Sequence, residues 1–322
     1  MARMLAVVAL FTLAWGPLAA GPAFAQAYPT KPIRLIVPFA AGGPVDFVAR
    51  LLAPKLTEAF RQSVVVDNRG GASGLIGIET AIRAQPDGYT LMIVSSTYAG
   101  TAALIKLPYD PVNDVTPLSM LGESASLITV HPSLPVASLR ELITYEQAHS
   151  GKLSFGSSGT GGSIHLGTEM FNQMAGTRMI HVPYKGQGPA VTDIVGGQIQ
   201  FLMGSPLVLT PHVKSGRLRA LAVTTAQRVS AMPEVPAVAE TVPGYETASW
   251  QAVLGPKNLP PDIAARWNQE LDRALQLPDI KARLTADGMQ LAGGASTRVM
   301  AVLARDVAKW QRVVKTAGIK LQ

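Results

Sequence analysis

The sequence predicts an α/β fold of two lobes, with mainly parallel sheets and a ligand cleft between the lobes. Strand-like and helix-like segments alternate almost without interruption after residue 25, which is typical of parallel sheets covered by helices. A strand, a glycine-rich turn and a helix follow one another twice, at residues 33–60 and 153–176, which indicates two similarly built lobes. The length of 322 residues, 48% of them hydrophobic, suits about two such units.

The first 25 residues have the pattern of a secretory signal peptide. Arg3 precedes an apolar run, and the segment ends in Ala-Phe-Ala, with small residues at the cleavage positions. The alternative is a membrane anchor, but Gly16 and Pro17 interrupt the run, which is short for a span of about 20 residues. We expect cleavage after Ala25 and a soluble mature chain outside the cytoplasm.

Composition narrows the classes of function. The absence of cysteine excludes a disulfide framework and a lipid anchor on an N-terminal cysteine. The formal charge of +7, which falls by one when Arg3 leaves, suits an anionic ligand or an acidic surface. The 28 lysines and arginines are scattered, with no basic run interleaved with aromatic residues, so no nucleic-acid partner is expected.

Eight apolar runs are predicted as strands, and five segments between them as helices. The strands are expected at residues 33–39, 63–68, 89–95, 126–132, 152–157, 179–184, 199–204 and 218–225. The helices are expected at residues 45–60, 75–84, 138–149, 163–175 and 189–195. From residue 261 onward the pattern is helical only, and this segment is expected to pack on the first half.

Extended apolar runs that follow loops at 122–130 and 245–256 are interpreted as the crossings between the lobes. The predicted division is a signal peptide at 1–25, a first lobe at 26–124 and 249–322, and a second lobe at 125–248. In open parallel sheets, ligands bind beyond the carboxyl ends of the strands, where helix N-termini converge. Two facing lobes would hold a ligand between their glycine turns.

The first glycine turn can bind an anion without a cationic side chain. The first N–H groups of a helix point outward, and the helix dipole adds partial positive charge there. Gly42 and Gly43 allow close approach, and Pro44 suits the first helical position, where its missing N–H has no consequence. Asp46 falls in the first helical turn and is interpreted chiefly as a partner of the dipole or a cap.

The second turn is the richer candidate, because hydroxyls and glycines together make a concave array of donors. Its hydroxyl residues and glycines are Ser157, Ser158, Gly159, Thr160, Gly161, Gly162 and Ser163. Ordinary turn and cap chemistry is the alternative for both turns. Two such turns in matching contexts favour binding.

Further candidates follow other strands. Ser95 and Thr97 come after a carboxyl end, where ligand contacts gather. Lys185 could attract an anion or be a solvated loop residue, and Tyr184 is expected as a cleft wall. His165 follows the second turn, where a packing role is the alternative.

The sequence lacks the motifs of a P-loop, a serine hydrolase and a metal site. A P-loop would need lysine where Gly162 stands, and a nucleophile elbow would need glycine where Thr160 stands. The five histidines show no metal-ligand spacing. We therefore expect no metal, no cofactor and no catalytic residue.

The sequence resembles the extracytoplasmic solute receptors of the tripartite tricarboxylate transporter family, called Bug receptors in some bacteria. The resemblance covers nearly the whole mature chain. It rests, in the family's order, on YPTKPIRLIVPFAAGG, VVVDNRGGASGLIG, AQPDGYTL, LPYDPVND, GSSGTGGSIHLGTEMF, HVPYKG, DIVGGQIQF, GRLRALAVTT and MPEVPAVAE. Departures are Ala41, Pro44 and Val45 in the first turn and Gly70 where proline commonly follows Asn-Arg.

The resemblance implies a two-lobed periplasmic binding protein, type II-like, that is not an enzyme. It would close as a monomer on a small carboxylate and deliver it to a permease with two integral membrane subunits. By this resemblance, the ligand contacts lie in the two glycine turns. The first turn contributes Phe39, Ala40, Ala41, Gly42 and Gly43, and the second contributes residues 157–162. Ser205 is a further expected wall of the cleft. An exported enzyme on a small anion, or a ligand-binding sensor, remains the alternative.

Overall fold

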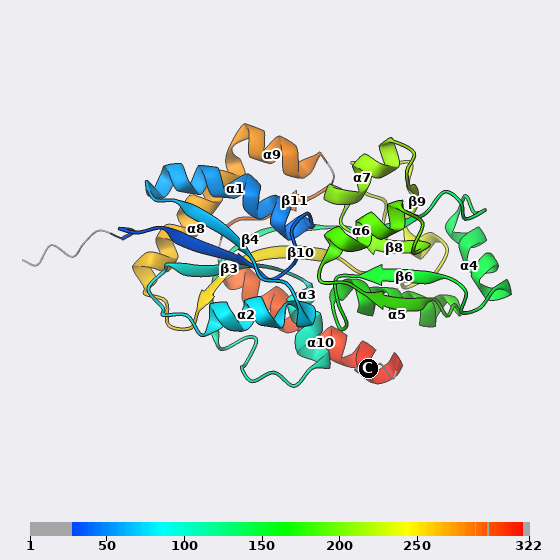
Figure 1. Cartoon of the computed structure of the whole chain (residues 1–322), viewed down its shortest axis with the longest axis horizontal. Coiled ribbons are helices and arrows are strands. Elements are labelled where there is room, and N and C mark those ends of the chain that lie inside the picture. Colours follow the sequence, from blue (N-terminus) through cyan, green and yellow to red (C-terminus); the bar gives the residue numbers. More distant parts are fainter. Residues whose placement is uncertain (1–27, 287, 295, 318–322) are drawn as a thin grey trace, which may run out of the picture.

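Two β-sheets, each covered by helices on both faces, form the two lobes of the protein (Figure 1). The computed structural model describes residues 28–286, 288–294 and 296–317. The first sheet has the strand order β11-β4-β10-β3-β1-β2, and the second has the order β7-β6-β8-β5-β9. The predicted signal peptide, with its cleavage after Ala25, lies outside the described residues.

The elements follow in chain order. The strands are β1 (Ile33–Val37), β2 (Val64–Asn68), β3 (Thr90–Ser95), β4 (Val115–Ser124), β5 (Leu127–Val130), β6 (Ser154–Ser157), β7 (Ile180–Pro183), β8 (Phe201–Gly204), β9 (Arg219–Val223), β10 (Ser249–Pro256) and β11 (Gln290–Leu291). The α-helices are α1 (Pro44–Phe60), α2 (Leu75–Ile82), α3 (Thr97–Leu104), α4 (Leu139–Ala148), α5 (Ser163–Ala175), α6 (Gln187–Val195), α7 (Pro206–Lys214), α8 (Pro261–Gln276), α9 (Pro278–Thr285) and α10 (Thr297–Ala317). Two short 3-10 helices lie at Ala72–Gly74 and Val238–Glu240.

Alternate residues of the central strands face two separate cores in the first lobe. In β1, Leu35 and Val37 belong to the core formed with α1, α8 and α9, whereas Ile36 belongs to the core formed with α2, α3 and α10. In β3, Ile93 and Met92 divide in the same way. Burial on both faces explains why these strands are continuous apolar runs.

The second lobe is built on the same principle. In β8, Phe201 and Met203 face the core with α4 and α5, while Leu202 faces the core with α6 and α7. The predicted α/β fold with two lobes is therefore confirmed, and each lobe has helices on both sides of its sheet (Figure 1).

Each sheet has three parallel strands at one end, and antiparallel strands appear where the chain crosses between the sheets. β1 is parallel to β2 and β3, and β6 is parallel to β7 and β8. β10 enters the first sheet between β3 and β4, antiparallel to both, and β5 is antiparallel to β8 and β9. The lobe boundaries proposed at 124/125 and 248/249 remain a prediction, which the change of sheet after β4 and before β10 supports.

The sequence pattern does not predict β4, α3 or α7. Pro117 and Gly122 interrupt the apolar pattern of β4, whose pairing with β10 contains two register shifts. The small residues of α3 and the two prolines of α7 obscure their helical periodicity. Both helices begin at the site described below. The sequence pattern therefore misses part of the site as well as part of the fold.

The C-terminal helices pack on the first lobe, as predicted, but the segment from residue 261 is not helical throughout, because the short strand β11 pairs with β4. α8 contacts β4 and α1, and α10 contacts α3 and β4. α10 also reaches α5 of the second lobe and so lies along both lobes on one side of the molecule (Figure 1). Within the described residues, no helix combines the length and apolar character needed to cross a membrane.

Candidate functional site

A narrow cavity lies between the lobes, where side chains from both sheets meet. The cavity volume is about 30 Å³. The lobes are therefore close together around the site. The lining residues are Phe39, Gly43, Pro44, Val45, Ser95, Thr97, Ser126, Ser158, Ser163, Ile164, Gln187, Ser205, Ser249 and Gln251.

Five helices begin at this cavity, within the part of the chain that the structure describes. α1 and α3 come from the first lobe, and α5, α6 and α7 come from the second; each contributes its first residues or its N-cap to the lining. Helix N-termini carry unpaired N–H groups and partial positive charge. Their convergence makes the cavity suited to an anion.

The N–H groups of two of these helices remain available at their first turns. In α1, the first intrahelical hydrogen bond runs from Phe47 N–H to Gly43 O (2.9 Å). The N–H groups of Val45 and Asp46 come before it and have no partner within the helix. In α5, the first such bond runs from Leu166 N–H to Gly162 O (2.9 Å). Glycine N-caps without side chains let a ligand approach both turns closely.

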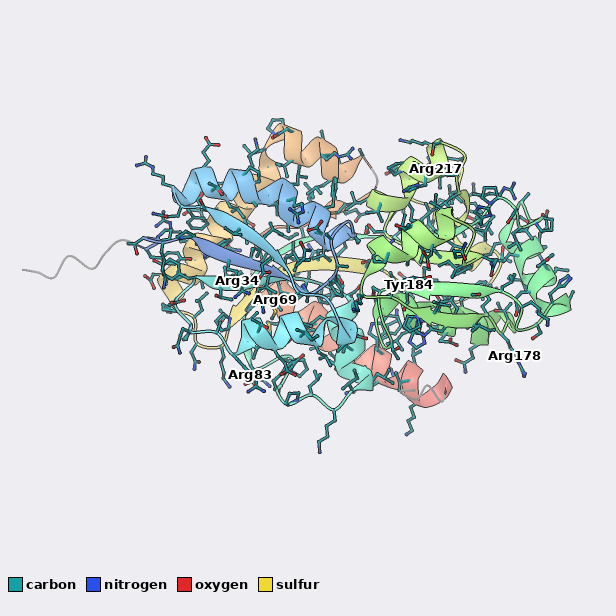
Figure 2. All side chains as sticks on the ribbon, viewed as in Figure 1. Arg34, Arg69, Arg83, Arg178, Tyr184 and Arg217 are labelled. Carbon is teal, nitrogen blue, oxygen red and sulfur yellow. The ribbon has the colours of Figure 1, made fainter. Side chains whose placement is uncertain are left out.

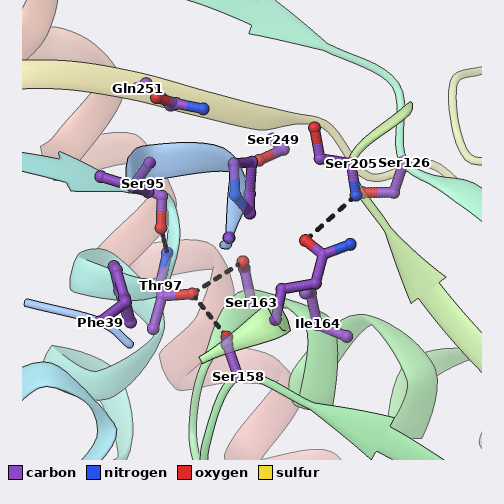
Figure 3. A pocket seen from close by; sticks show the side chains of 14 residues that line it. Phe39, Ser95, Thr97, Ser126, Ser158, Ser163, Ile164, Ser205, Ser249 and Gln251 are labelled. Carbon is purple, nitrogen blue, oxygen red and sulfur yellow. Dashed lines mark hydrogen bonds between the residues drawn. The ribbon is translucent and has the colours of Figure 1, made fainter. Parts of the chain in front are cut away.

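Hydroxyl groups from both lobes surround this point (Figure 3). Thr97 Oγ1 lies 3.3 Å from Ser158 Oγ and 3.4 Å from Ser163 Oγ. Ser96 Oγ–H also donates to Ser163 Oγ across the lobes at 2.9 Å. Because hydroxyls both donate and accept, this cluster can reorient its protons toward a carboxylate oxygen.

A stack of two buried rings, Phe155 and His165, and the half-buried ring of His181 supports the second glycine turn from behind. Ser157 Oγ lies 2.6 Å from His181 Nε2, and Gly161 N–H donates to His165 Nδ1 at 3.0 Å. The two imidazole rings stack at 3.8 Å between centroids, and Phe155 stacks on His181 at 5.0 Å. Burial lowers the pKa of His165 to about 4, and burial followed by the neighbouring His165 lowers the pKa of His181 to about 3. Neutral rings therefore hold the turn in shape.

Other predicted residues join the two lobes. Ala40 N–H donates to Lys185 O at 2.9 Å, and Ser73 Oγ–H donates to Thr160 O at 2.6 Å. Gly70 leaves room for the first of these bonds, since an added Cβ would lie 2.8 Å from Ala40 N. These contacts lie beside the cavity and join the two lobes there.

The remaining predicted residues lie outside the cavity. Ala41 and Gly42 are exposed and border a broader surface groove next to α6. Gly42 N–H donates to the Asp46 carboxylate at 2.9 Å. Burial alone would raise the pKa of Asp46, but hydrogen bonds from Arg50 and Gly42 hold it below its usual value. Asp46 thus caps the turn, which agrees with the interpretation preferred from the sequence.

Tyr184 and Lys185 also turn away from the site. The Tyr184 hydroxyl donates to Asp193 Oδ2 at 2.6 Å, and the Lys185 side chain is exposed. Of the seventeen predicted contacts, those that line the cavity are Phe39, Gly43, Ser95, Thr97, Ser158 and Ser205. Gly159, Gly161, Gly162 and His165 instead shape the turn beside it.

The excess of basic residues is not concentrated at the cavity. Figure 2 shows Arg34, Arg69 and Arg83 on the first lobe and Arg178 and Arg217 on the second. Among the described residues that line the cavity, there is no charged side chain. An anion would be held there by uncharged donors, which are backbone N–H, hydroxyl and amide groups.

Several lining residues are not predicted from the sequence. Ser249 and Gln251 alternate along β10, and Ser126 precedes β5. The alternation of polar residues in an otherwise apolar strand was the available signal, but only the pairing of β10 places it at the cleft. Gln187, the first residue of α6, follows Gly186 in a glycine turn that the sequence pattern singled out only for Tyr184 and Lys185. In the described part of the chain, no group of three histidine or acidic side chains is arranged to hold a metal ion.

Comparisons with known proteins agree with this architecture. A family described as "Tripartite tricarboxylate transporter family receptor" matches residues 48–319. Protein BugT of Bordetella pertussis is 35% identical over 326 residues, which cover all of this chain and 99% of that protein. The structure of the periplasmic binding protein BugD is 31% identical with a TM-score of 0.88, covering 92% of this chain and all of that one. The structure of R. palustris Rpa4515 with adipate is 36% identical with a TM-score of 0.87, covering 91% of this chain and 99% of that one.

Proposed function

Because the chain belongs to the tripartite tricarboxylate transporter receptor family, we propose that it captures a small carboxylate between its two lobes and delivers it to a membrane permease of that transporter type. We further propose that it works as a monomer in the periplasm after loss of residues 1–25. Receptors of this kind bind a solute as the two lobes come together, which links capture to a change of shape.

The observation that carries the proposal is the convergence of five helix N-termini on a cavity without charged side chains. Helix N-termini bind carboxylates and phosphates through N–H groups and the helix dipole. The hydroxyls of Thr97, Ser158 and Ser163 add donors at the same place. Rpa4515, the similar protein whose structure contains adipate, supports a carboxylate as the ligand class.

The proposed ligand contacts are the predicted residues that line the cavity, with the first turns of α1 and α5 as the carboxylate site. Phe39, Gly43 and Thr97 come from the first lobe, and Ser158 and Ser205 come from the second. Both lobes then contribute to one ligand. This arrangement supports binding that strengthens when the lobes close.

The geometry gives little support to the alternative of an exported enzyme. Ser157 and His181 form a close serine–histidine pair, but Ser157 is fully buried and neither residue lines the cavity. Ser158 does line the cavity, and its hydroxyl pairs with the hydroxyl of Thr97 rather than with a base. A nucleophile needs a general base within hydrogen-bond reach. We therefore propose binding without catalysis.

The test is a thermal-shift screen of the chain from residue 26 onward against mono-, di- and tricarboxylates, aromatic acids, amino acids, phosphates and sugars, with hits titrated by calorimetry. A ligand at 100 times its Kd should stabilise the native state by about 2.7 kcal/mol. Carboxylates should produce the shift, without turnover by mass spectrometry. A shift by phosphates or sugars alone would contradict the proposed ligand class.

Delivery to a permease is tested separately in cells. Uptake of the radiolabelled carboxylate should depend on this gene and on a pair of permease genes. Normal uptake without the gene, combined with a ligand-dependent transcriptional response that needs it, would favour the sensor alternative.

A further inference from the structure

Two leucines of the second lobe are buried in the cores of the first lobe. Among the described residues, Leu166 of α5 is the single second-lobe member of the core with α2, α3 and α10. Leu207 of α7 holds the same place in the core with α1, α8 and α9. Leu166 is fully buried, and Leu207 is 4% exposed. The second lobe therefore contributes one apolar side chain to each of the cores on the two faces of the first sheet.

Each leucine follows directly on residues of the ligand cavity. In α5, Ser163 and Ile164 line the cavity, and Leu166 comes two residues after Ile164. In α7, the N-cap residue Ser205 lines the cavity, and Leu207 is the second helical residue. The first turn of each helix therefore faces the cavity on one side and is anchored in the first lobe on another.

Other apolar side chains of the same helices face the second lobe. Leu209 of α7 belongs to the second-lobe core with α6, and Phe171 of α5 belongs to the second-lobe core with α4. Successive residues of a helix are about 100° apart, so Leu207 and Leu209 point to opposite sides of α7. The burial of Leu207 is therefore due to the first lobe and not to the core of its own lobe.

The surroundings of both leucines belong to the contact between the lobes. α5 packs against α3 and α10 of the first lobe. Leu207 borders a surface groove together with Phe47 of α1, which packs on the same first-lobe core. Separation of the lobes would expose both leucines to water and leave a gap in each core, and both changes are unfavourable.

We propose that Leu166 and Leu207 are positioning residues for ligand capture, which bring the N-termini of α5 and α7 to the ligand by packing into the two cores of the first lobe. This inference rests on the proposed function. Neither leucine lines the cavity. Their burial stabilises the closed arrangement, in which both lobes contact the ligand, and so raises its affinity.

The first experiment measures adipate binding by calorimetry. Leu166→Ala and Leu207→Ala should each weaken adipate binding by at least about tenfold, because the closed arrangement loses a buried leucine. Leu166→Met and Leu207→Met keep an apolar side chain of similar volume and should stay within about threefold of the wild type. If an alanine variant does not fold, the valine variant at that position replaces it, with an expected loss of about threefold.

The matched controls are Leu209→Ala and Leu142→Ala, which remove buried leucines from the two cores of the second lobe. Both should lower the Tm of the protein. Because these leucines do not contribute to the first-lobe cores, the affinity of the folded variants for adipate should change by less than about twofold. A merely structural role of Leu166 and Leu207 would give the same result as these controls.

The second experiment measures the separation of the lobes without a ligand. The chain has no cysteine, so Glu58→Cys in α1 and Lys152→Cys before β6, both at exposed positions, provide two unique sites for spin labels. Pulsed electron spin resonance should show a ratio of separated to closed molecules at least about tenfold higher in Leu166→Ala and Leu207→Ala than in the wild type. Leu209→Ala should give the wild-type ratio.

Wild-type affinity and wild-type label distances in both alanine variants would overturn the inference, because the leucines would then serve only the fold. An equal loss of affinity in Leu209→Ala would also overturn it, since any damage to a core would have the same effect. If neither adipate nor any other carboxylate binds the wild type, the proposed function itself fails. The label distances then still decide whether the two leucines hold the lobes together.

Discussion

The backbone N–H of Ala40 donates a 2.9 Å hydrogen bond to the backbone carbonyl of Lys185 on the opposite lobe. The sequence marks both residues as candidate ligand contacts, yet here their backbones bond to each other. Together with the bond from Ser73 to Thr160, this contact brings the lobes together beside the cavity. We infer that ligand exchange requires such bonds to break, so contacts away from the ligand contribute to affinity.

Gly100 in α3 should be required for closure. An added Cβ would lie 2.5 Å from Gly161 O and 3.1 Å from Ser163 N, both on the second lobe. Alanine is favourable inside a helix, so Gly100→Ala should leave the first lobe stable but hold the lobes apart. We expect calorimetry to show at least a tenfold loss of carboxylate affinity, about 1.4 kcal/mol.

The control for this variant is Gly196→Ala, where the nearest atoms to an added Cβ are 3.4 Å and 3.7 Å away on its own helix. Its affinity should equal that of the wild type. Wild-type affinity in Gly100→Ala would show that α3 and the second glycine turn need not approach this closely for the ligand to bind.

Ser73→Ala should weaken binding without touching the ligand. The Ser73 hydroxyl bonds to Thr160 O at 2.6 Å across the lobes, and Ser73 does not line the cavity. Loss of one such bond should reduce affinity by about 0.5–1.5 kcal/mol. Thr80→Ala, which removes a 2.7 Å hydroxyl bond to Ile76 O within α2, is the matched control. Equal affinities for the two variants would argue against a role of the cross-lobe bond.

The stacked pair of His165, which is buried, and His181, which is half-buried, should make stability depend on pH. The pKa of His165 is about 4 and that of His181 about 3 in the folded chain, because burial disfavours their charged forms. Below pH 6.5 the unfolded chain binds protons at these rings that the folded chain does not, so stability falls as pH decreases toward 4. The loss is about 1.4 kcal/mol per pH unit for each histidine.

Urea unfolding at pH 7, 6 and 5 measures this effect. In His181→Gln, an amide can replace the contact to Ser157. The free energy of unfolding should then decline less steeply with falling pH, because one fewer proton is taken up on unfolding, a difference in slope of about 1.4 kcal/mol per pH unit. Identical slopes for the variant and the wild type would contradict the assigned pKa direction.

Asp306 should stabilise the first lobe through Trp250. The indole Nε1–H donates to Asp306 Oδ2 at 2.7 Å, with both residues buried. Asp306→Ala leaves this N–H unpaired and should lower the free energy of unfolding by about 1–3 kcal/mol. Asp262→Ala, at an exposed position in α8, should change it by less than about 0.5 kcal/mol. A loss in Asp306→Ala no greater than in the control would mean that the indole N–H finds another partner.

Local pattern predicts most of the fold and part of the site. The strand, turn and helix around Gly43, and those around Ser158, are encoded within about 25 residues each, and both turns meet at the cavity. The strand β4 escapes prediction because Pro117 and Gly122 interrupt its apolar pattern, and only its pairing with β10, more than a hundred residues away, shows it as a strand. For the same reason, nothing local shows that Gln251 faces a ligand cavity while its neighbour Trp250 faces a core.

The sequence by itself determined the α/β class, the two glycine turns and the family resemblance, because strand periodicity, helix N-termini and turn glycines depend on neighbours along the chain. Only the tertiary structure decided which predicted groups face the cavity. The N–H of Ala40 donates to the carbonyl of Lys185, His165 supports a turn, and Gln187 and Gln251 line the cavity. The physical reason is that these contacts form between lobes or between distant strands, whose approach depends on packing of the whole chain.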